Sequence, residues 1–125
     1  MSTKTEGKHP SEFIVSESNG TQSRDKVTVT VPAGETYVPG TVLGQNTTSA
    51  KYRAYDDAAS DGHDVAAGIL FGECDNSAGV GAVDFEDAVI INWSAEVRAA
   101  DLVWGLGVDD DGGLADLATL GIKAR

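Results

Sequence analysis

The chain has 125 residues, of which 41% are hydrophobic and 23% are charged. This length suits one domain, and the composition can bury a core, which excludes a wholly disordered chain. Nine Lys and Arg stand against twenty Asp and Glu, giving a formal charge of -11. A net negative surface argues against direct binding to nucleic-acid phosphates or to anionic lipid.

Cysteine content and hydropathy further limit the kinds of protein that the chain can be. The chain has one cysteine, Cys74, so no intrachain disulfide can hold the fold. Its apolar runs fall short of the roughly 18–20 residues of a membrane span. Residues 1–12 lack the apolar stretch of a secretory signal. We therefore expect a soluble protein that folds in the cytoplasm where it is made and has no membrane partner.

The charge is distributed unevenly along the chain. Residues 1–53 hold six basic and five acidic side chains, whereas residues 54–122 hold fifteen acidic side chains and one basic one, Arg98. The first part is thus near neutral, and the remainder forms an acidic body that repels polyanions. We interpret most of these acids as a solubilising surface.

The first residues predict a flexible arm. Residues 1–11 are polar and lack periodicity, which is typical of a disordered start. An apolar island follows at residues 13–15, and residues 16–23 are again polar. The island has too few apolar neighbours to form a core of its own. It is either a strand of the domain or an adhesive segment that waits for a partner.

Four strands are predicted in the first part of the domain. Residues 26–31 alternate strictly, with three valines on one face, as in a half-buried strand. Further strands are expected at residues 41–45 and 51–55, and residues 56–64 form a polar loop. Residues 65–71 are apolar throughout, which indicates a strand covered on both sides.

The remaining strands follow the same logic. Residues 83–86 alternate before an apolar run at residues 88–91, and residues 95–99 alternate again ahead of an apolar segment at residues 102–104. About seven short strands separated by glycine-rich turns predict an all-β barrel or sandwich.

One short helix is predicted to close the domain. Leu114, Leu117 and Ala118 would share one helical face. Residues 109–111 are acidic at the end where the helix macrodipole favours negative charge. Gly121 stands where a C′ glycine ends a helix.

No catalytic or metal-binding set emerges from the sequence. The histidines are His9, in the polar start, and His63, in a polar loop whose acids lack a second His or Cys at ligand spacing. The chain has no nucleophile elbow, and acids around Cys74 disfavour a reactive thiolate. The contiguous acids at residues 109–111 do not follow EF-hand spacing. We expect no enzymatic activity, no metal and no cofactor.

Five groups of segments, taken in order, carry a resemblance to a known family. The segments are residues 13–21 with 23–27, residues 40–44, residues 52–72 with Ala-Ala-Gly-Ile-Leu at 66–70, residues 94–98 with 102–104, and residues 117–122. Together they resemble the lambda-type bacteriophage head decoration proteins, in the family's order of arm and first strand, next strand, central loop with apolar strand, and C-terminal end. The resemblance covers roughly residues 12–125 of the chain.

The resemblance implies a β-clip type pseudo-barrel of short strands with one short C-terminal helix. It also implies a flexible arm at residues 1–25 and a β-rich decoration domain at residues 26–125. Family members bind as trimers at three-fold sites on the outer surface of the expanded head and stabilise it against the pressure of packaged DNA. Their arm becomes ordered on the shell as an added strand, and the family has no catalytic residues.

The arm is therefore predicted to pair with a strand of the major capsid protein through its apolar island and its flanks. This segment consists of Glu12, Phe13, Ile14, Val15, Ser16 and Glu17. The candidate interface residues of a homotrimer are Ile90, Trp93 and Trp104, and core burial is expected for at least two of them.

Two other function classes remain open. A free-standing β-sandwich that binds carbohydrate or mediates cell adhesion needs an aromatic platform, for which two Trp, three Tyr and three Phe are available. A small hydrolase that uses His63 is the third alternative.

Overall fold

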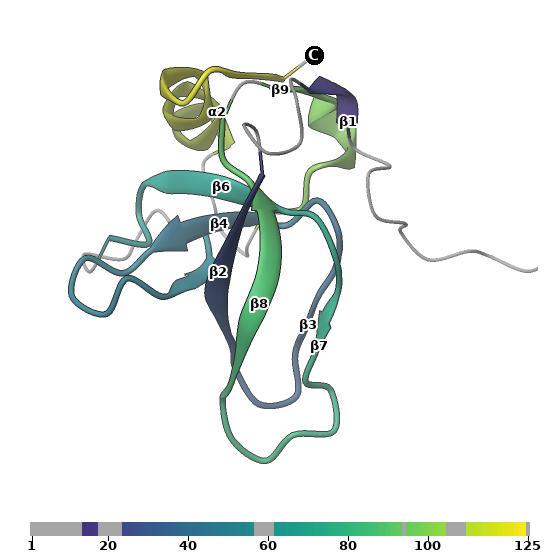
Figure 1. Ribbon diagram of the computed structural model, residues 1–125, viewed down its shortest axis with the longest axis vertical. Helices are drawn as coiled ribbons and strands as arrows, with labels where there is room; N and C mark the ends of the chain where they lie inside the picture. The colour runs from purple at the N-terminus through teal and green to yellow at the C-terminus, as the bar shows by residue number, and fades with distance from the viewer. Residues whose placement is uncertain (1–13, 18–23, 57–61, 94, 105–109, 125) are drawn as a thin grey trace, which may run out of the picture.

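The described part of the chain consists mainly of β-strands, with one α-helix near its C-terminal end (Figure 1). The computed structural model describes residues 14–17, 24–56, 62–93, 95–104 and 110–124. The predicted all-β class with a short closing helix is thereby confirmed. The elements are β1 (Ile14–Glu17), β2 (Arg24–Val31), β3 (Thr36–Tyr37), β4 (Val42–Gln45), β5 (Tyr52–Ala54), β6 (Ala66–Leu70), β7 (Cys74–Asp75), β8 (Val83–Ile91), β9 (Ala95–Val97), the 3-10 helix η1 (Ala99–Asp101), α2 (Asp110–Thr119) and β10 (Ile122–Ala124).

Five strands close into a barrel in the order β2, β5, β4, β6 and β8. β8 completes it by pairing antiparallel with β2, from Arg24 opposite Ile91 to Val31 opposite Val83. The contact between β2 and β5 is parallel. Closure removes the exposed sheet edges through which β-rich chains aggregate.

Two smaller sheets accompany the barrel. β9 lies between β1, its antiparallel neighbour, and β10, its parallel neighbour. β3 and β7 form a two-stranded antiparallel ladder. Figure 1 places β1, β9 and α2 at one end of the molecule, whereas β3 and β7 lie alongside β8 toward the other end.

Neighbouring residues on the central barrel strands are buried on opposite faces of the sheet. This follows from the two-residue period of a strand, which turns successive side chains to opposite sides. The predicted apolar strand that is covered on both sides is therefore confirmed as β6 for Ala66–Leu70, whereas Val65, at the start of the predicted segment, lies outside the strand and is 52% exposed. The pairs without exposed surface are Val42 and Leu43 on β4, Ile69 and Leu70 on β6, and Ile90 and Ile91 on β8.

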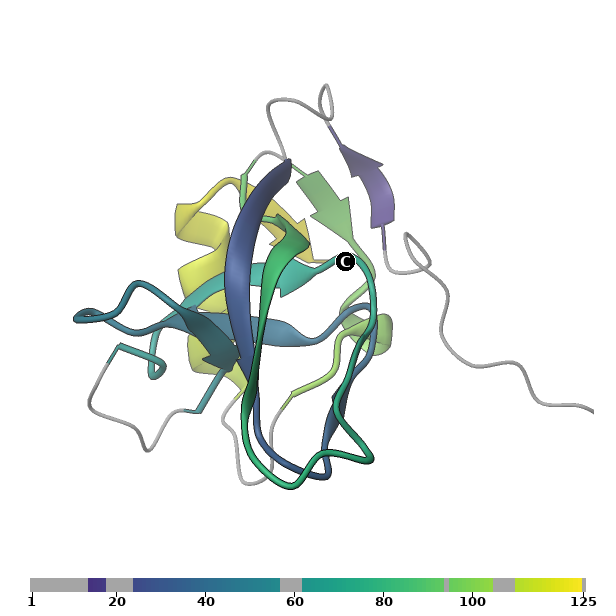
Figure 2. The same cartoon turned by 60° about the horizontal axis from the view of Figure 1, so that its bottom comes forward.

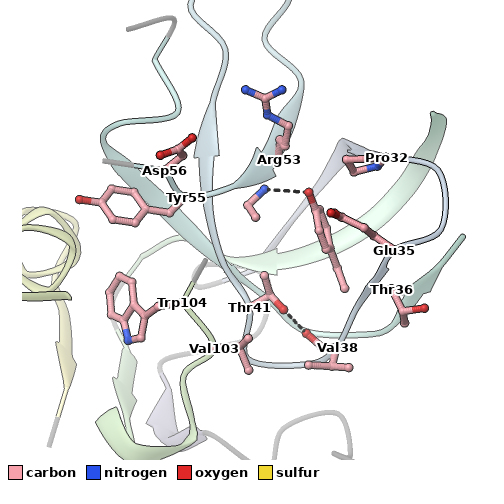
Figure 3. Close-up of a pocket in the computed structure, with 12 residues that line it drawn as sticks. Pro32, Glu35, Thr36, Val38, Thr41, Arg53, Tyr55, Asp56, Val103 and Trp104 are labelled. Atoms are coloured by element: carbon pink, nitrogen blue, oxygen red, sulfur yellow. Dashed lines mark hydrogen bonds between the residues drawn. The ribbon is translucent and has the colours of Figure 1, made fainter. Parts of the chain in front are cut away.

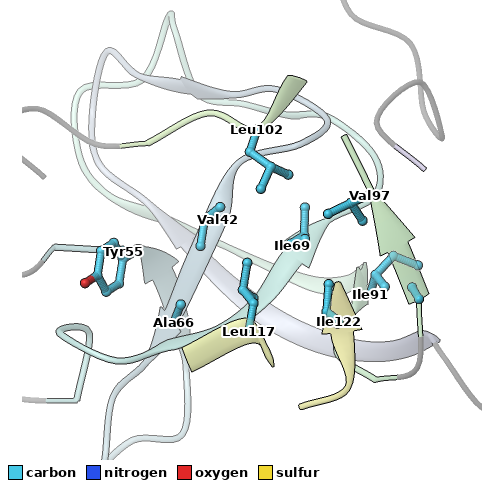
Figure 4. Packing of buried hydrophobic residues seen from close by; sticks show 10 residues of the cluster. Val42, Tyr55, Ala66, Ile69, Ile91, Val97, Leu102, Leu117 and Ile122 are labelled. Atoms are coloured by element: carbon cyan, nitrogen blue, oxygen red, sulfur yellow. The ribbon is translucent and has the colours of Figure 1, made fainter. Parts of the chain in front are cut away.

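The two faces belong to two separate cores. The first core joins the barrel to β9, β10 and α2 (Figure 4). The second core joins the barrel strands to β3 and β7. The first contains Val42, Tyr55, Ala66, Ile69, Ile91, Ala95, Val97, Leu102, Leu117 and Ile122. The second contains Val29, Val31, Tyr37, Leu43, Tyr52, Leu70, Cys74 and Ile90.

Several predicted boundaries differ from the observed ones. β2 begins at Arg24, two residues before the predicted strand. The segment at residues 102–104 contributes only an isolated bridge between Thr41 and Val103. β3, β7 and β10 were not predicted. β3 and β7 have two residues each, too few to display a periodicity, and β10 follows directly on the turn that ends the helix.

Most of the sequence-based predictions for the closing helix α2 are confirmed. Leu117 is fully buried and Leu114 partly buried against the first core. Ala118 is exposed, so the predicted shared face is wrong for this residue. The buried row continues instead through Leu120, three residues after Leu117. Gly121 ends the helix with φ of 81°, and its N–H donates to the carbonyl oxygen of Ala118 at 3.0 Å.

Trp104 packs between the barrel and the start of this helix. Its ring meets that of Tyr55 edge to face, with ring centres 5.7 Å apart and an interplanar angle of 76°. Gly113 lies directly against the indole, so that a methyl group on Gly113 would overlap the ring of Trp104. A Cβ atom there would also lie 3.3 Å from the ring of Tyr55.

This contact predicts the effect of Gly113→Ala on stability. Alanine improves helix propensity by about 1 kcal/mol, whereas overpacking costs about 1–3 kcal/mol. Because the indole is fixed between the barrel and α2, the cost of the overlap should exceed the gain in helix propensity. Chemical denaturation should therefore show a lower free energy of unfolding for Gly113→Ala. Gly72→Ala is the control, because a Cβ atom at Gly72 meets nothing within 4 Å. A more stable Gly113→Ala variant would contradict the tight packing of Trp104.

Candidate functional site

The predicted arm segment lies on an edge of the domain's own three-stranded sheet. Ile14 of β1 is opposite Val97 of β9, and Glu17 is opposite Ala95, with a bulge between Ile14 and Ser16. Ile14 is half-buried against the first core. Figure 2 shows β1 alongside β9. Of the two interpretations of the apolar island, the structure shows a strand of the domain.

The other edge of β1 is open among the described residues. β1 stands at the end of the order β1, β9, β10, so in the described part of the chain only β9 pairs with it. An edge strand presents unpaired backbone N–H and C=O groups, which is the template that β-augmentation uses. The site is therefore a short, preformed strand edge.

The predicted capsid-binding residues are only partly placed by the structure. Ile14, Val15, Ser16 and Glu17 form β1. Glu12 and Phe13 lie outside the described residues. Their role in binding stays a prediction, as does the division into an arm and a domain at residue 25.

Ile90, Trp93 and Trp104, the candidate trimer contacts, have three different environments. Ile90 is fully buried in the second core, so its assignment to an interface is wrong: its side chain has no accessible surface. Trp104 is partly buried against the first core. Trp93 is 47% exposed and is the candidate that is open to a partner.

A hollow of about 470 Å³ opens beside Trp104 (Figure 3). Within it the backbone N–H of Ala54 donates to the Tyr37 hydroxyl at 3.3 Å, and the Thr41 hydroxyl donates to the Val38 carbonyl at 2.7 Å. Burial raises the pKa of Tyr37. The lining consists of Pro32, Glu35, Thr36, Tyr37, Val38, Thr41, Arg53, Ala54, Tyr55, Asp56, Val103 and Trp104.

This hollow does not form the aromatic platform that a carbohydrate-binding module needs. Tyr55 is 3% exposed, and its ring stands at 76° to that of Trp104. Two rings in this arrangement do not present a common flat surface for stacking a sugar. The observed geometry therefore gives the carbohydrate hypothesis no support.

The surroundings of His63 indicate that it holds a loop against the barrel. It is buried, and its Nδ1 atom lies 3.2 Å from the Nη2 atom of Arg53. Its backbone runs so close to β4 that a Cβ atom at Gly44 would lie 2.6 Å from the Cα atom of His63. The His63 carbonyl also accepts a hydrogen bond from the backbone N–H of Asp56 at 2.9 Å. A glycine at position 44 is thus needed to seat this loop on the barrel.

Cys74 also lacks the properties of a reactive cysteine. The side chain is 3% exposed in the second core. Burial, and secondarily the charge of Glu73, raise the pKa of the thiol to about 11. At neutral pH the residue is therefore a thiol, as the sequence predicts.

Searches for two other kinds of site give negative results within the described ranges. The side chains placed there contain no group of three or more His, Cys, Asp or Glu that could hold a metal ion. The helices of those ranges are too short or too polar to cross a bilayer. Asp110 and Asp111 open α2, as the helix prediction required, and residue 109 lies outside the described part.

The chain is similar in sequence to one known protein family. The family model of bacteriophage lambda head decoration protein D matches residues 3–123 of the chain. A search of the curated proteins gave no match. The match spans the barrel, both smaller sheets and the helix, and it agrees with the resemblance in the segments described above. The chain belongs to the head decoration protein D family, which implies association with a phage capsid.

Proposed function

We propose that the chain is a cement protein that binds the outer surface of an expanded phage head. It acts as a homotrimer at three-fold sites, contacts the major capsid protein and stabilises the head against the pressure of packaged DNA. It does so without catalysis, without a cofactor and without touching nucleic acid. Family membership over residues 3–123 supports this function, and the open edge of β1 is the observation that carries its mechanism.

The mechanism is β-augmentation on a sheet that already exists. A strand of the capsid protein pairs with the free edge of β1 and extends the order β1, β9, β10 by one strand. Ordering a residue costs about 1–2 kcal/mol of backbone entropy, so a preformed strand of four residues avoids roughly 4–8 kcal/mol. Holding β1 on β9 therefore favours binding.

Stabilisation of the head follows from linkage. A protein that binds the expanded lattice but not the compact one stabilises the expanded state, by about 2.7 kcal/mol per site when its free concentration is a hundred times the dissociation constant. A trimer presents three strand edges together, so the second and third contacts become intramolecular. Such avidity adds roughly 10²–10⁴ in affinity.

Removal of β1 tests the mechanism. Deleting residues 2–17 should leave a folded barrel, because β1 is not one of the five barrel strands. Its melting temperature should fall slightly, since Ile14 no longer covers the first core. The protein concentration needed to saturate expanded heads, measured by titration and gel densitometry, should rise by about a hundredfold or more.

The matched control deletes residues 2–11 and keeps β1 intact. This variant should occupy heads at nearly the same concentration as the full chain. If the longer deletion also saturates the heads at that concentration, the capsid does not use the edge of β1.

The homotrimer is tested independently of the head. A closed ring of three uses a heterologous interface, in which different patches of neighbouring copies meet. Sedimentation equilibrium at micromolar concentration should give about 39 kDa, three times the 12.9 kDa of one chain. A mass of about one chain at micromolar concentration would contradict a preformed trimer.

A further inference from the structure

Trp93 is an unusual feature of the surface. Four large hydrophobic side chains of the described residues are exposed, and Trp93, at 47%, is the aromatic one. The other three are Val65, Val80 and Val83. A scattered exposed valine needs no explanation. Tryptophan is different, because it is among the residues that dominate the binding energy of protein interfaces.

The strand register places Trp93 between the end of β1 and the start of β2. Glu17, the last residue of β1, lies opposite Ala95. Arg24, the first residue of β2, lies opposite Ile91. The two ends of the connection from β1 to β2 therefore flank the short segment that carries Trp93. Trp93 is two residues before Ala95, so it lies near the end of β1.

The segment that carries Trp93 is itself uncharged, although charged residues of both signs lie around it. Residues 88–95 carry no charge. Beside them lie Arg24, Asp25 and Lys26 of β2. On the other side, Glu17 of β1 is opposite Ala95, and Glu96 follows Ala95 on β9. The guanidinium carbon of Arg24 is 4.2 Å from the ring centre of Phe71, a cation–π contact that holds it in place. Aromatic residues and Arg are enriched in interfaces, and the centres of interfaces are depleted of charge.

We propose that Trp93 anchors the domain on the head by entering an apolar depression of the capsid protein, beside the strand that pairs with β1. This rests on the proposed function, because it takes the capsid protein as the partner. Neighbouring strands lie about 4.8 Å apart, whereas a specific interface covers about 800 Å² on each side. An interface of that size centred on β1 is large enough to reach Trp93. β1 supplies backbone hydrogen bonds, and Trp93 supplies the buried apolar contact.

Substitution of Trp93 tests the proposal. Trp93→Ala should require about 10–100 times more protein to saturate expanded heads, and Trp93→Phe should lose less. The side chain is half-exposed, so both variants should melt close to the temperature of the unaltered protein. Val80→Ala is the matched control. Val80 is also exposed but lies beyond the far end of the nine-residue strand β8, roughly 30 Å away, and its loss should leave occupancy unchanged.

Oxidative footprinting identifies what covers the side chain. Hydroxyl radicals should modify Trp93 in the free protein, and binding to heads should protect it, with Trp104 as the internal reference. Protection of Trp93 in concentrated protein without heads would place it between copies of this chain and overturn the proposal.

The outcomes separate this proposal from the proposed function. If Trp93→Ala saturates heads at the unaltered concentration while the deletion of residues 2–17 does not, Trp93 is no anchor and the strand mechanism stands. If the unaltered protein does not bind expanded heads, the proposed function itself fails, and the Trp93 proposal fails with it.

Discussion

The fold depends on burying both faces of the same barrel strands. Leu43, Leu70 and Ile90 point into one core, while their neighbours Val42, Ile69 and Ile91 point into the other. Each of these side chains loses all of its exposed surface, and full burial of one such side chain is worth about 1.5–3 kcal/mol. The first core can form only if β9, β10 and α2 cover the outer face of the barrel. The position of the small sheet is therefore a consequence of barrel packing.

This arrangement also explains how the strand that we propose for binding is held in place. β1 has four residues and pairs with a strand of three, which is marginal for an isolated sheet. Here β9 is anchored by Ala95 and Val97 in the first core, and Ile14 adds to the same core. The free edge of β1 is thus supported by the packing that closes the domain.

The sequence predicts some of these features and cannot predict others. The apolar run that became β6 and the alternation of β2 indicate their burial directly, because both patterns are local. The glycine that ends α2 is also a local signal. Pairing of β1 with β9 joins residues far apart in the chain, so periodicity cannot reveal it. Ile90 and Trp93 are both apolar and close in sequence, yet one is buried and the other exposed, because the strand ends between them.

If the proposal is right, the domain docks by the end that carries β1, with β1 still paired to β9. A cryo-electron microscopy map of expanded heads saturated with the protein is the decisive test. We expect a strand of the capsid protein next to β1, continuing the sheet of β1, β9 and β10, and Trp93 buried at the contact. A map in which β1 has left β9, or in which the loop around Val80 faces the shell, would contradict it.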